Sequence, residues 1–360
     1  HTRWATHGAA TDTNAHPHLD CKNRIALVHN GIIENFQELK TKLIKQGHRF
    51  KSATDTEIIV HLIEKYYQGD FEQALRRAVA QLEGSFALGV ISGDEPDKLF
   101  ALRRFSPLVI GLGGNENFIA SDVPAILNYT RRVIYLSDDE MAIIKKGSVK
   151  IKDLKGRSIQ RKASTIKWNI KEAQKQGFSH FMLKEIHEQP KVSRQIISSR
   201  LGKNNKIYFQ EARLKPKMLK SVEQIIILAC GTAFHAGLIG KYIIEKLTDI
   251  SVWVDFSSEF RYRNCVVKKN TLVIAISQSG ETADTLAAVK EAKAKGAHIL
   301  SICNVIGSSL VRESDAVIYT HAGPEIGVAS TKAYTAQLLV LDLLAMYLAE
   351  LRGQLTKNQK

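Results

Sequence analysis

The sequence predicts two domains of different fold class: an α+β domain of antiparallel sheet layers with helices, followed by an α/β domain with a five-stranded parallel sheet. The chain has 360 residues, enough for two hydrophobic cores. Short strands separated by hairpin turns fill residues 85–151, whereas strands alternate with helices after residue 225. Hairpins produce antiparallel sheets, and parallel strands need a crossover that is usually a helix.

The first half opens with an apolar strand, 25–29, and three helical stretches, 36–45, 56–67 and 71–82. Thr54 and Asp55 precede the second helix and are favourable residues for its start. Seven further strands are expected at 85–91, 98–103, 108–112, 117–120, 133–136, 141–144 and 149–151. Pairs such as Gly93-Asp94 and Gly147-Ser148 lie between them and are typical of hairpin turns.

A basic stretch after residue 151 marks the expected domain boundary. Residues 169–195 have a polar helical pattern, interrupted at Gly177 and Pro190, and we interpret them as a connector. We therefore expect a first domain at 1–151, a linker and connecting helix at 152–195, and a second domain at 196–355.

The second half alternates apolar strands with helices. The expected strands are 225–229, 251–254, 272–276, 298–303 and 316–320, and the helices after them are 235–247, 257–263, 282–295, 309–313 and 331–351. This alternation is typical of a doubly wound parallel sheet, in which ligands bind beyond the carboxyl ends of the strands.

Three loops at those strand ends are rich in small polar residues: 230–233, 277–280 and 327–332. Ser277, Ser279 and Thr282 offer hydroxyl groups beside the free N–H groups of a helix start, a combination that binds anions. The absence of lysine from this turn excludes a nucleotide P-loop. These hydroxyls could instead serve only as helix caps. The repetition at three corresponding places favours a ligand pocket.

The first half carries groups suited to an amino-acid amide such as glutamine. Arg3 could clamp a carboxylate, and Asp55 could accept an ammonium group. The Asn30 amide and the Gly31 N–H, which follow a strand, could stabilise an oxyanion. Cys21 is the only cysteine in this half, and we interpret it as an ordinary loop residue in preference to a catalytic thiol.

The formal net charge of +15 raises the possibility of an anionic partner. The densest basic run, Lys145–Lys162, contains no aromatic residue, so we interpret it as a solvated face. Nucleic acid is a minor alternative, and we expect none as a partner. A basic surface also attracts small anionic substrates.

The four cysteines are scattered, which argues against a zinc finger or a disulfide framework and favours the reducing cytoplasm. The histidines His7, His16, His18 and His29 could ligate a metal, but we favour loop structure or substrate contacts, and expect neither metal nor cofactor. No apolar run reaches the length of a membrane span. The stretch Leu338–Leu348, which contains Asp342, is expected to be a buried helix.

Several motifs together resemble the glutamine–fructose-6-phosphate aminotransferase (isomerising) family. They are His1–Gly8, His29–Asn35, Ser52–Glu57, Lys184–Pro190, Ala229–Thr232, Ile276–Thr282 and Glu325–Lys332. The resemblance implies an N-terminal-nucleophile glutaminase domain and two sugar-isomerase (SIS) subdomains. Glutamine would supply ammonia through an internal channel, and fructose 6-phosphate would become glucosamine 6-phosphate, on the route to UDP-N-acetylglucosamine.

The resemblance also implies roles for individual residues. Asn30 and Gly31 would form the oxyanion hole, and Trp4 would gate the channel. The residues implied in glutamine binding are Arg3, Trp4, Thr6, His7, His16 and Asp55. Those implied in sugar-phosphate binding are Cys230, Gly231, Thr232, Ser277, Gln278, Ser279, Thr282, Val328, Ala329 and Ser330. The family often has serine where this chain has Ala233.

The family's nucleophilic cysteine would precede His1, and its second SIS subdomain, with the isomerase histidine, glutamate and lysine, would follow Leu351. We therefore expect a fragment that is inactive alone and that forms a homodimer when full length. Lys332 is not expected to replace the missing lysine. The alternative is a module that binds sugar phosphate without catalysis.

Overall fold

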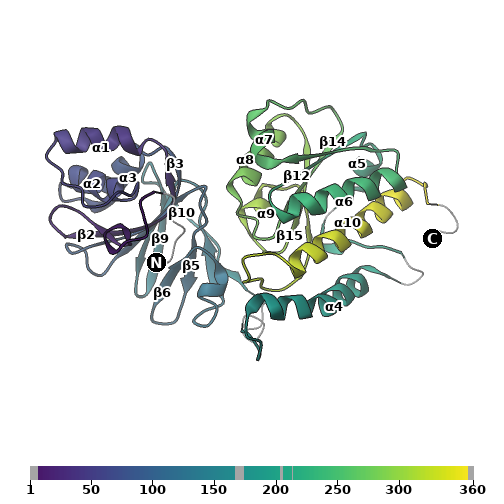
Figure 1. The fold of residues 1–360 in the computed structure, drawn as a ribbon, viewed down its shortest axis with the longest axis horizontal. Helices are drawn as coiled ribbons and strands as arrows, with labels where there is room; N and C mark the ends of the chain where they lie inside the picture. Colours follow the sequence, from purple (N-terminus) through teal and green to yellow (C-terminus); the bar gives the residue numbers. More distant parts are fainter. Residues whose placement is uncertain (1–6, 167–173, 203–205, 213, 356–360) are drawn as a thin grey trace. The chain divides into compact units, whose positions relative to one another are not determined.

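The structure is a computed structural model that describes residues 7–166, 174–202, 206–212 and 214–355 (Figure 1). The chain divides into two compact units, residues 1–166 and 167–360. Each unit is described by itself below.

Residues 7–166, the described part of the first unit, form two antiparallel sheets and three α-helices. Its helices are α1 (Phe36–Lys45), α2 (Glu57–Tyr66) and α3 (Phe71–Val79), with short 3-10 turns at Asp12–Asn14 and Val123–Ala125. The larger sheet has the order β1 (His18–Leu19), β2 (Ile25–Ile33), β3 (Gly84–Ser92), β4 (Leu99–Arg104), β8 (Glu140–Lys145), β9 (Ser148–Asp153) and β10 (Ser158–Ile159). The smaller sheet has the order β11 (Ser164–Thr165), β7 (Arg132–Tyr135), β5 (Val109–Leu112) and β6 (Asn117–Ala120).

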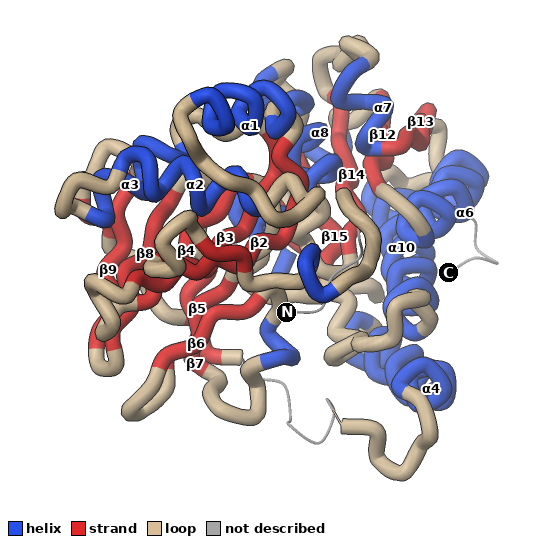
Figure 2. Tube along the Cα trace, turned by 60° about the vertical axis from the view of Figure 1, so that its left-hand side comes forward, coloured by secondary structure: helices blue, strands red, loops and turns tan. Residues whose placement is uncertain are grey.

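Strand β4 shows how the larger sheet is covered on both faces. Phe100 and Leu102 pack in the core beneath α1, α2 and α3, whereas Ala101 between them packs toward the smaller sheet. Side chains alternate between the faces of a strand, so neighbouring residues of β4 meet the helices and the second sheet in turn. The unit is therefore layered as helices, larger sheet and smaller sheet (Figure 2).

The second unit is built on a five-stranded sheet in which all pairs are parallel. Its order is β13 (Ser251–Phe256), β12 (Gln224–Ala229), β14 (Thr271–Ser277), β15 (His298–Cys303) and β16 (Ala316–Tyr319). The helices are α4 (Phe181–Arg200), α5 (Pro216–Lys220), α6 (Thr232–Leu247), α7 (Ser257–Tyr262), α8 (Ala283–Ala294), α9 (Ser309–Glu313) and α10 (Lys332–Leu351), with a 3-10 turn at Gln210–Ala212. Helices α6 and α10 cover one face, and α7, α8 and α9 the other (Figure 1). The predicted fold class is confirmed.

Two local predictions are wrong. Strand β2 continues to Ile33, so Asn30 and Gly31 lie within the strand and not after it, because the pairing with β3 extends over both residues. Pro190 lies inside α4 and does not interrupt it. A proline removes one helical hydrogen bond, and here the packing of α4 on α10 holds the helix together across that point.

Helix α10 is long and apolar enough to qualify, by length and composition, as a candidate membrane span. Its residues Val340, Leu344 and Leu348 are fully buried in the core of the second unit. Asp342 lies between them in sequence. The expected buried helix is therefore present, and its hydrophobicity is explained by the core that it fills.

Candidate functional site

The three polar loops of the second unit line one cavity of about 460 Å³. It lies at the carboxyl ends of β12 and β14, where a doubly wound sheet binds its ligands. Its lining residues are Cys230, Gly231, Thr232, Ala233, Ile276, Ser277, Gln278, Ser279, Thr282, Glu325, Gly327, Val328, Ala329, Ser330 and Gln337. All ten residues that the sequence singled out for a sugar phosphate are among them.

The turn after β14 uses its own hydroxyl groups to hold its shape. Ser277 Oγ accepts the Gly280 N–H at 3.0 Å and lies 3.3 Å from Thr282 Oγ1. Ser279 Oγ accepts the Glu281 N–H at 3.2 Å. Because a hydroxyl group that accepts a hydrogen bond still has its own hydrogen to donate, the Ser279 hydroxyl can cap the turn and also bind an anion.

Contacts with the β15–α9 segment fix this turn from behind. Gly280 has φ = +67°, and a Cβ atom there would lie 2.1 Å from Ser308 Oγ. The Leu310 N–H donates to the Gly280 carbonyl at 2.9 Å, and the Ser309 N–H donates to Glu281 Oε1 at 2.7 Å. The turn is thus preorganised, which reduces the ordering cost of binding.

Two buried or half-buried glutamates fix the third loop. Glu325 accepts the Thr331 N–H at 2.9 Å, the Ala333 N–H at 3.0 Å and the Ser330 hydroxyl at 2.8 Å. Glu185 of α4, 1% exposed, accepts the Ile326 N–H at 2.7 Å. Glu325 thus satisfies backbone donors at the start of α10, and Glu185 satisfies one in the loop before it.

Lys332 does not line the cavity. Its Nζ atom lies 2.6 Å from the half-buried Glu188 Oε2 in an ion pair between α10 and α4, and Lys184 Nζ lies 3.2 Å from Glu188 Oε1. This geometry agrees with a structural role for Lys332. The sequence motif Lys184–Pro190 was recognised, but its function as a support for the loop at 325–331 was not evident before the structure.

The structure describes some of the residues predicted to bind glutamine. Arg3, Trp4 and Thr6 lie outside the described residues. Asp55 is 1% exposed, and its Oδ2 atom accepts the Ile33 N–H at 2.8 Å, while its Oδ1 atom lies 4.0 Å from His7 Nδ1.

Asp55 and His7 thus meet at the end of β2, the strand that carries Asn30 and Gly31. Gly31 has φ = +140°, and a Cβ atom there would lie 2.0 Å from the Ser85 carbonyl oxygen. This approach requires glycine. His16 contacts the same strand four residues before Ile33, where its Nδ1 atom accepts the His29 N–H at 3.4 Å.

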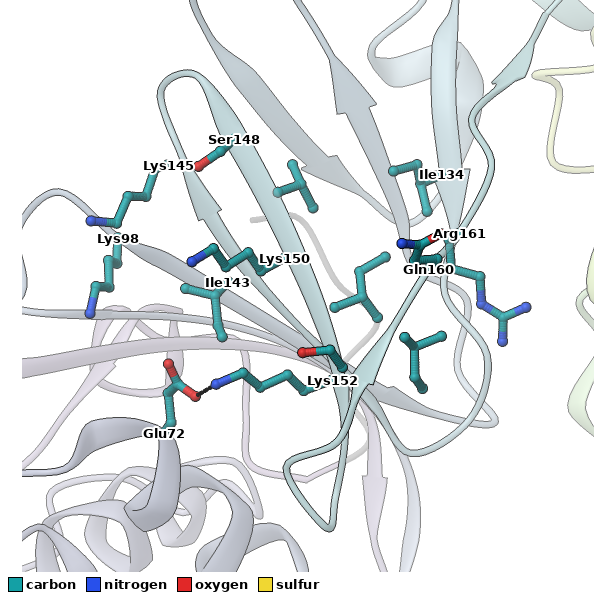
Figure 3. Close-up of a pocket in the computed structure, with 14 residues that line it drawn as sticks. Glu72, Lys98, Ile134, Ile143, Lys145, Ser148, Lys150, Lys152, Gln160 and Arg161 are labelled. Carbon is teal, nitrogen blue, oxygen red and sulfur yellow. Dashed lines mark hydrogen bonds and ion pairs between the residues drawn. The ribbon is translucent and has the colours of Figure 1, made fainter.

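A wider hollow of about 880 Å³ lies along β9 in the first unit (Figure 3). Five basic side chains line it, and four of them pair with carboxylates: Lys98 with Glu95, Lys145 with Asp97, Lys152 with Glu72 and Arg161 with Glu140. The residues that line it include no aromatic side chain. Its charge is largely neutralised, so it does not favour a nucleic-acid site.

Comparisons with known proteins show which domains the chain carries and which proteins it resembles. A glutamine amidotransferase domain model matches residues 1–128, and a SIS domain model matches residues 218–347. The chain therefore joins an amidotransferase domain to a SIS domain. Over 359 residues it is 52% identical to the glutamine–fructose-6-phosphate aminotransferase (isomerizing) of Clostridium tetani and 51% identical to that of Thermus thermophilus.

A structure of the C-terminal domain of glucosamine-fructose-6-phosphate aminotransferase from Francisella tularensis is also similar, with 43% identity and a TM-score of 0.50 over 52% of each chain. The chain is thus similar to these glutamine–fructose-6-phosphate aminotransferases along its whole length. It spans 59% of the length of the two relatives named above.

Proposed function

We propose that this chain takes part in the glutamine-dependent conversion of fructose 6-phosphate to glucosamine 6-phosphate. Residues 1–151 would take nitrogen from glutamine, and residues 196–355 would form a sugar-phosphate-binding SIS subdomain. The observation that carries the proposal is the single cavity into which all three polar loops of the parallel sheet project.

The cavity suits a phosphate dianion. Ser277, Ser279 and Thr282 bring hydroxyl groups to one turn, and the N–H groups that begin α8 add the positive end of a helix. The sugar would extend toward Val328 and Ser330, on the opposite loop. Val328 is 90% exposed, so this side of the cavity is open to a ligand.

In the first unit, Asp55 would bind the ammonium group of glutamine, and the Asn30 amide with the Gly31 N–H would stabilise the oxyanion formed at its side-chain amide. Asp55 suits this role because its backbone contact to Ile33 fixes it beside β2. For the whole protein we propose a cytoplasmic homodimer with no nucleic acid or membrane partner.

Calorimetric titration with fructose 6-phosphate tests the cavity. Ser279→Ala and Thr282→Ala should each weaken binding by about 1–3 kcal/mol, roughly 5- to 150-fold, because each removes a donor to a charged group. Ser314→Ala is the matched control, since that hydroxyl bonds the Leu310 carbonyl away from the cavity. Unchanged affinity in both variants, with the fold intact, would mean that these hydroxyls only cap the turn.

A second assay separates catalysis from binding alone. The whole protein, supplied with glutamine and fructose 6-phosphate, should form glucosamine 6-phosphate. Sugar-phosphate binding without that product would support the non-catalytic module instead.

A further inference from the structure

Four side chains of the first unit, none of them among the proposed glutamine ligands, converge on one point. Cys21 lies in the loop before β2, His48 lies in the loop after α1, and His61 and Glu64 lie three residues apart on α2. One donor atom from each, a sulfur, two Nδ1 nitrogens and a carboxylate oxygen, lies within 4.8 Å of all the others.

The separations of these atoms match the edges of a tetrahedron around zinc. The two Nδ1 atoms are 3.3 Å apart, and Cys21 Sγ lies 3.8 Å from His48 Nδ1 and 3.6 Å from His61 Nδ1. Glu64 Oε2 lies 3.1 and 3.4 Å from the same two nitrogens. Zinc bonds of about 2.0–2.3 Å at tetrahedral angles put ligand atoms about 3.3–3.6 Å apart.

The surroundings orient the ligands. The other ring nitrogen of His61, Nε2, lies 3.6 Å from Glu57 Oε1. Glu57 itself accepts the Lys51 and Ser52 N–H groups at 2.8 and 2.7 Å. A carboxylate behind a histidine ligand is a common outer contact of metal sites, because it turns the free nitrogen toward the ion. The ring of Phe50 packs on His61 and shields it.

We propose that Cys21, His48, His61 and Glu64 bind one divalent zinc ion. One thiolate, two imidazoles and one carboxylate are a ligand set that favours zinc over magnesium or calcium. Four protein ligands close the coordination shell, so the site is structural and holds no catalytic water. The exposed Cys21 provides the entry route for the ion.

The ion would join three segments that the backbone alone leaves separate: the loop before β2, the loop after α1 and helix α2. His48 and His61 stand on either side of Asp55 in sequence, so the ion would also fix the segment that carries it. The metal site stands on its own geometry and does not require the proposed function.

Metal analysis of the whole purified chain tests the proposal. Wild type and Cys265→Ser, a half-buried cysteine of the second unit, should each retain about one zinc ion per chain after dialysis. Cys21→Ser and His61→Ala should lose it, and a chelator should lower the unfolding temperature of wild type by several degrees without changing that of Cys21→Ser. Equal zinc in wild type and Cys21→Ser, or no stoichiometric zinc in wild type, would overturn the proposal.

Cobalt substitution in the wild-type chain keeps the test decisive if a variant fails to fold. Co²⁺ should give the intense visible absorption of a tetrahedral ion and a thiolate-to-cobalt charge-transfer band in the near ultraviolet. Weak octahedral bands, or no charge-transfer band, would show that Cys21 is not a ligand and would refute the site.

Discussion

Replacing Gly280 by alanine should destabilise the second unit and weaken ligand binding. At its φ of +67°, alanine is about 1–2 kcal/mol less favourable than glycine, because the left-handed backbone brings Cβ too close to a carbonyl oxygen. The added Cβ atom would also lie 2.1 Å from Ser308 Oγ and 2.8 Å from Cys303 Sγ, two buried atoms that cannot move into solvent. Overpacking of this kind costs about 1–3 kcal/mol more, so the total is about 2–5 kcal/mol.

The variant Gly296→Ala separates the backbone cost from the overpacking cost. Gly296 has φ = +88° at the end of α8, but nothing lies within 4 Å of the position of its Cβ atom. Its substitution should therefore cost only the backbone share, about 1–2 kcal/mol. The two glycines belong to the same unit and flank the same helix, which makes them a matched pair.

Hydrogen–deuterium exchange of peptides from β14 reports the free energy of opening in the second unit without interference from the first. Calorimetry with fructose 6-phosphate measures ligand affinity, which should fall if the turn after β14 changes shape. We expect Gly280→Ala to exchange faster than Gly296→Ala and to bind more weakly. Equal exchange in the two variants would refute the claim that Ser308 and Cys303 exclude a side chain at Gly280.

Two further predictions concern buried polar groups. Burial raises the pKa of the Cys303 thiol from 9.0 to about 11, so the stability it contributes is complete below about pH 9 and is lost as the pH rises toward 11. A shift of this size corresponds to a loss of roughly 3 kcal/mol of stability. Urea unfolding of Cys303→Ala should lack that part of the decline at high pH, and parallel pH curves for the two proteins would contradict the prediction. Lys332→Met should destabilise the packing of α4 on α10 by about 2–4 kcal/mol in urea unfolding, because the half-buried Glu188 loses one of its two lysine partners. It should leave fructose 6-phosphate affinity within a few fold. Loss of binding comparable to that of Thr282→Ala would instead make Lys332 a phosphate ligand.

The sequence predicted the architecture and the cavity well because both depend on regular patterns. Apolar strands that alternate with helices dictate a parallel sheet, and a parallel sheet brings the loops after β12 and β14 to one edge. The meeting of Thr232 with Ser277 therefore follows from topology. Predicting the cavity therefore required no knowledge of individual contacts between side chains distant in sequence.

Features that depend on tertiary contacts were not predictable in the same way. Because Asn30 is polar, the sequence pattern suggests that β2 ends before it. The pairing of β2 with β3 shows that the strand continues to Ile33. Pro190 is normally a helix breaker, and the packing that overrides it comes from α10, far along the chain. Cys21, His48 and His61 have no short spacing that a motif search would recognise, and His61 with Glu64 on one helix face was the only local signal.

The support that α4 gives to the cavity has a practical consequence for anyone who isolates the sugar-phosphate unit. The SIS match begins at residue 218, yet α4, which begins at Phe181, supplies Glu185 to the loop at 325–331 and Glu188 to Lys332 at the start of α10. A piece cut at the edge of the match would lose two anchoring carboxylates and expose an apolar face of α10. A truncated protein that is meant to bind the sugar phosphate should therefore begin before Ser179, so that it includes all of α4.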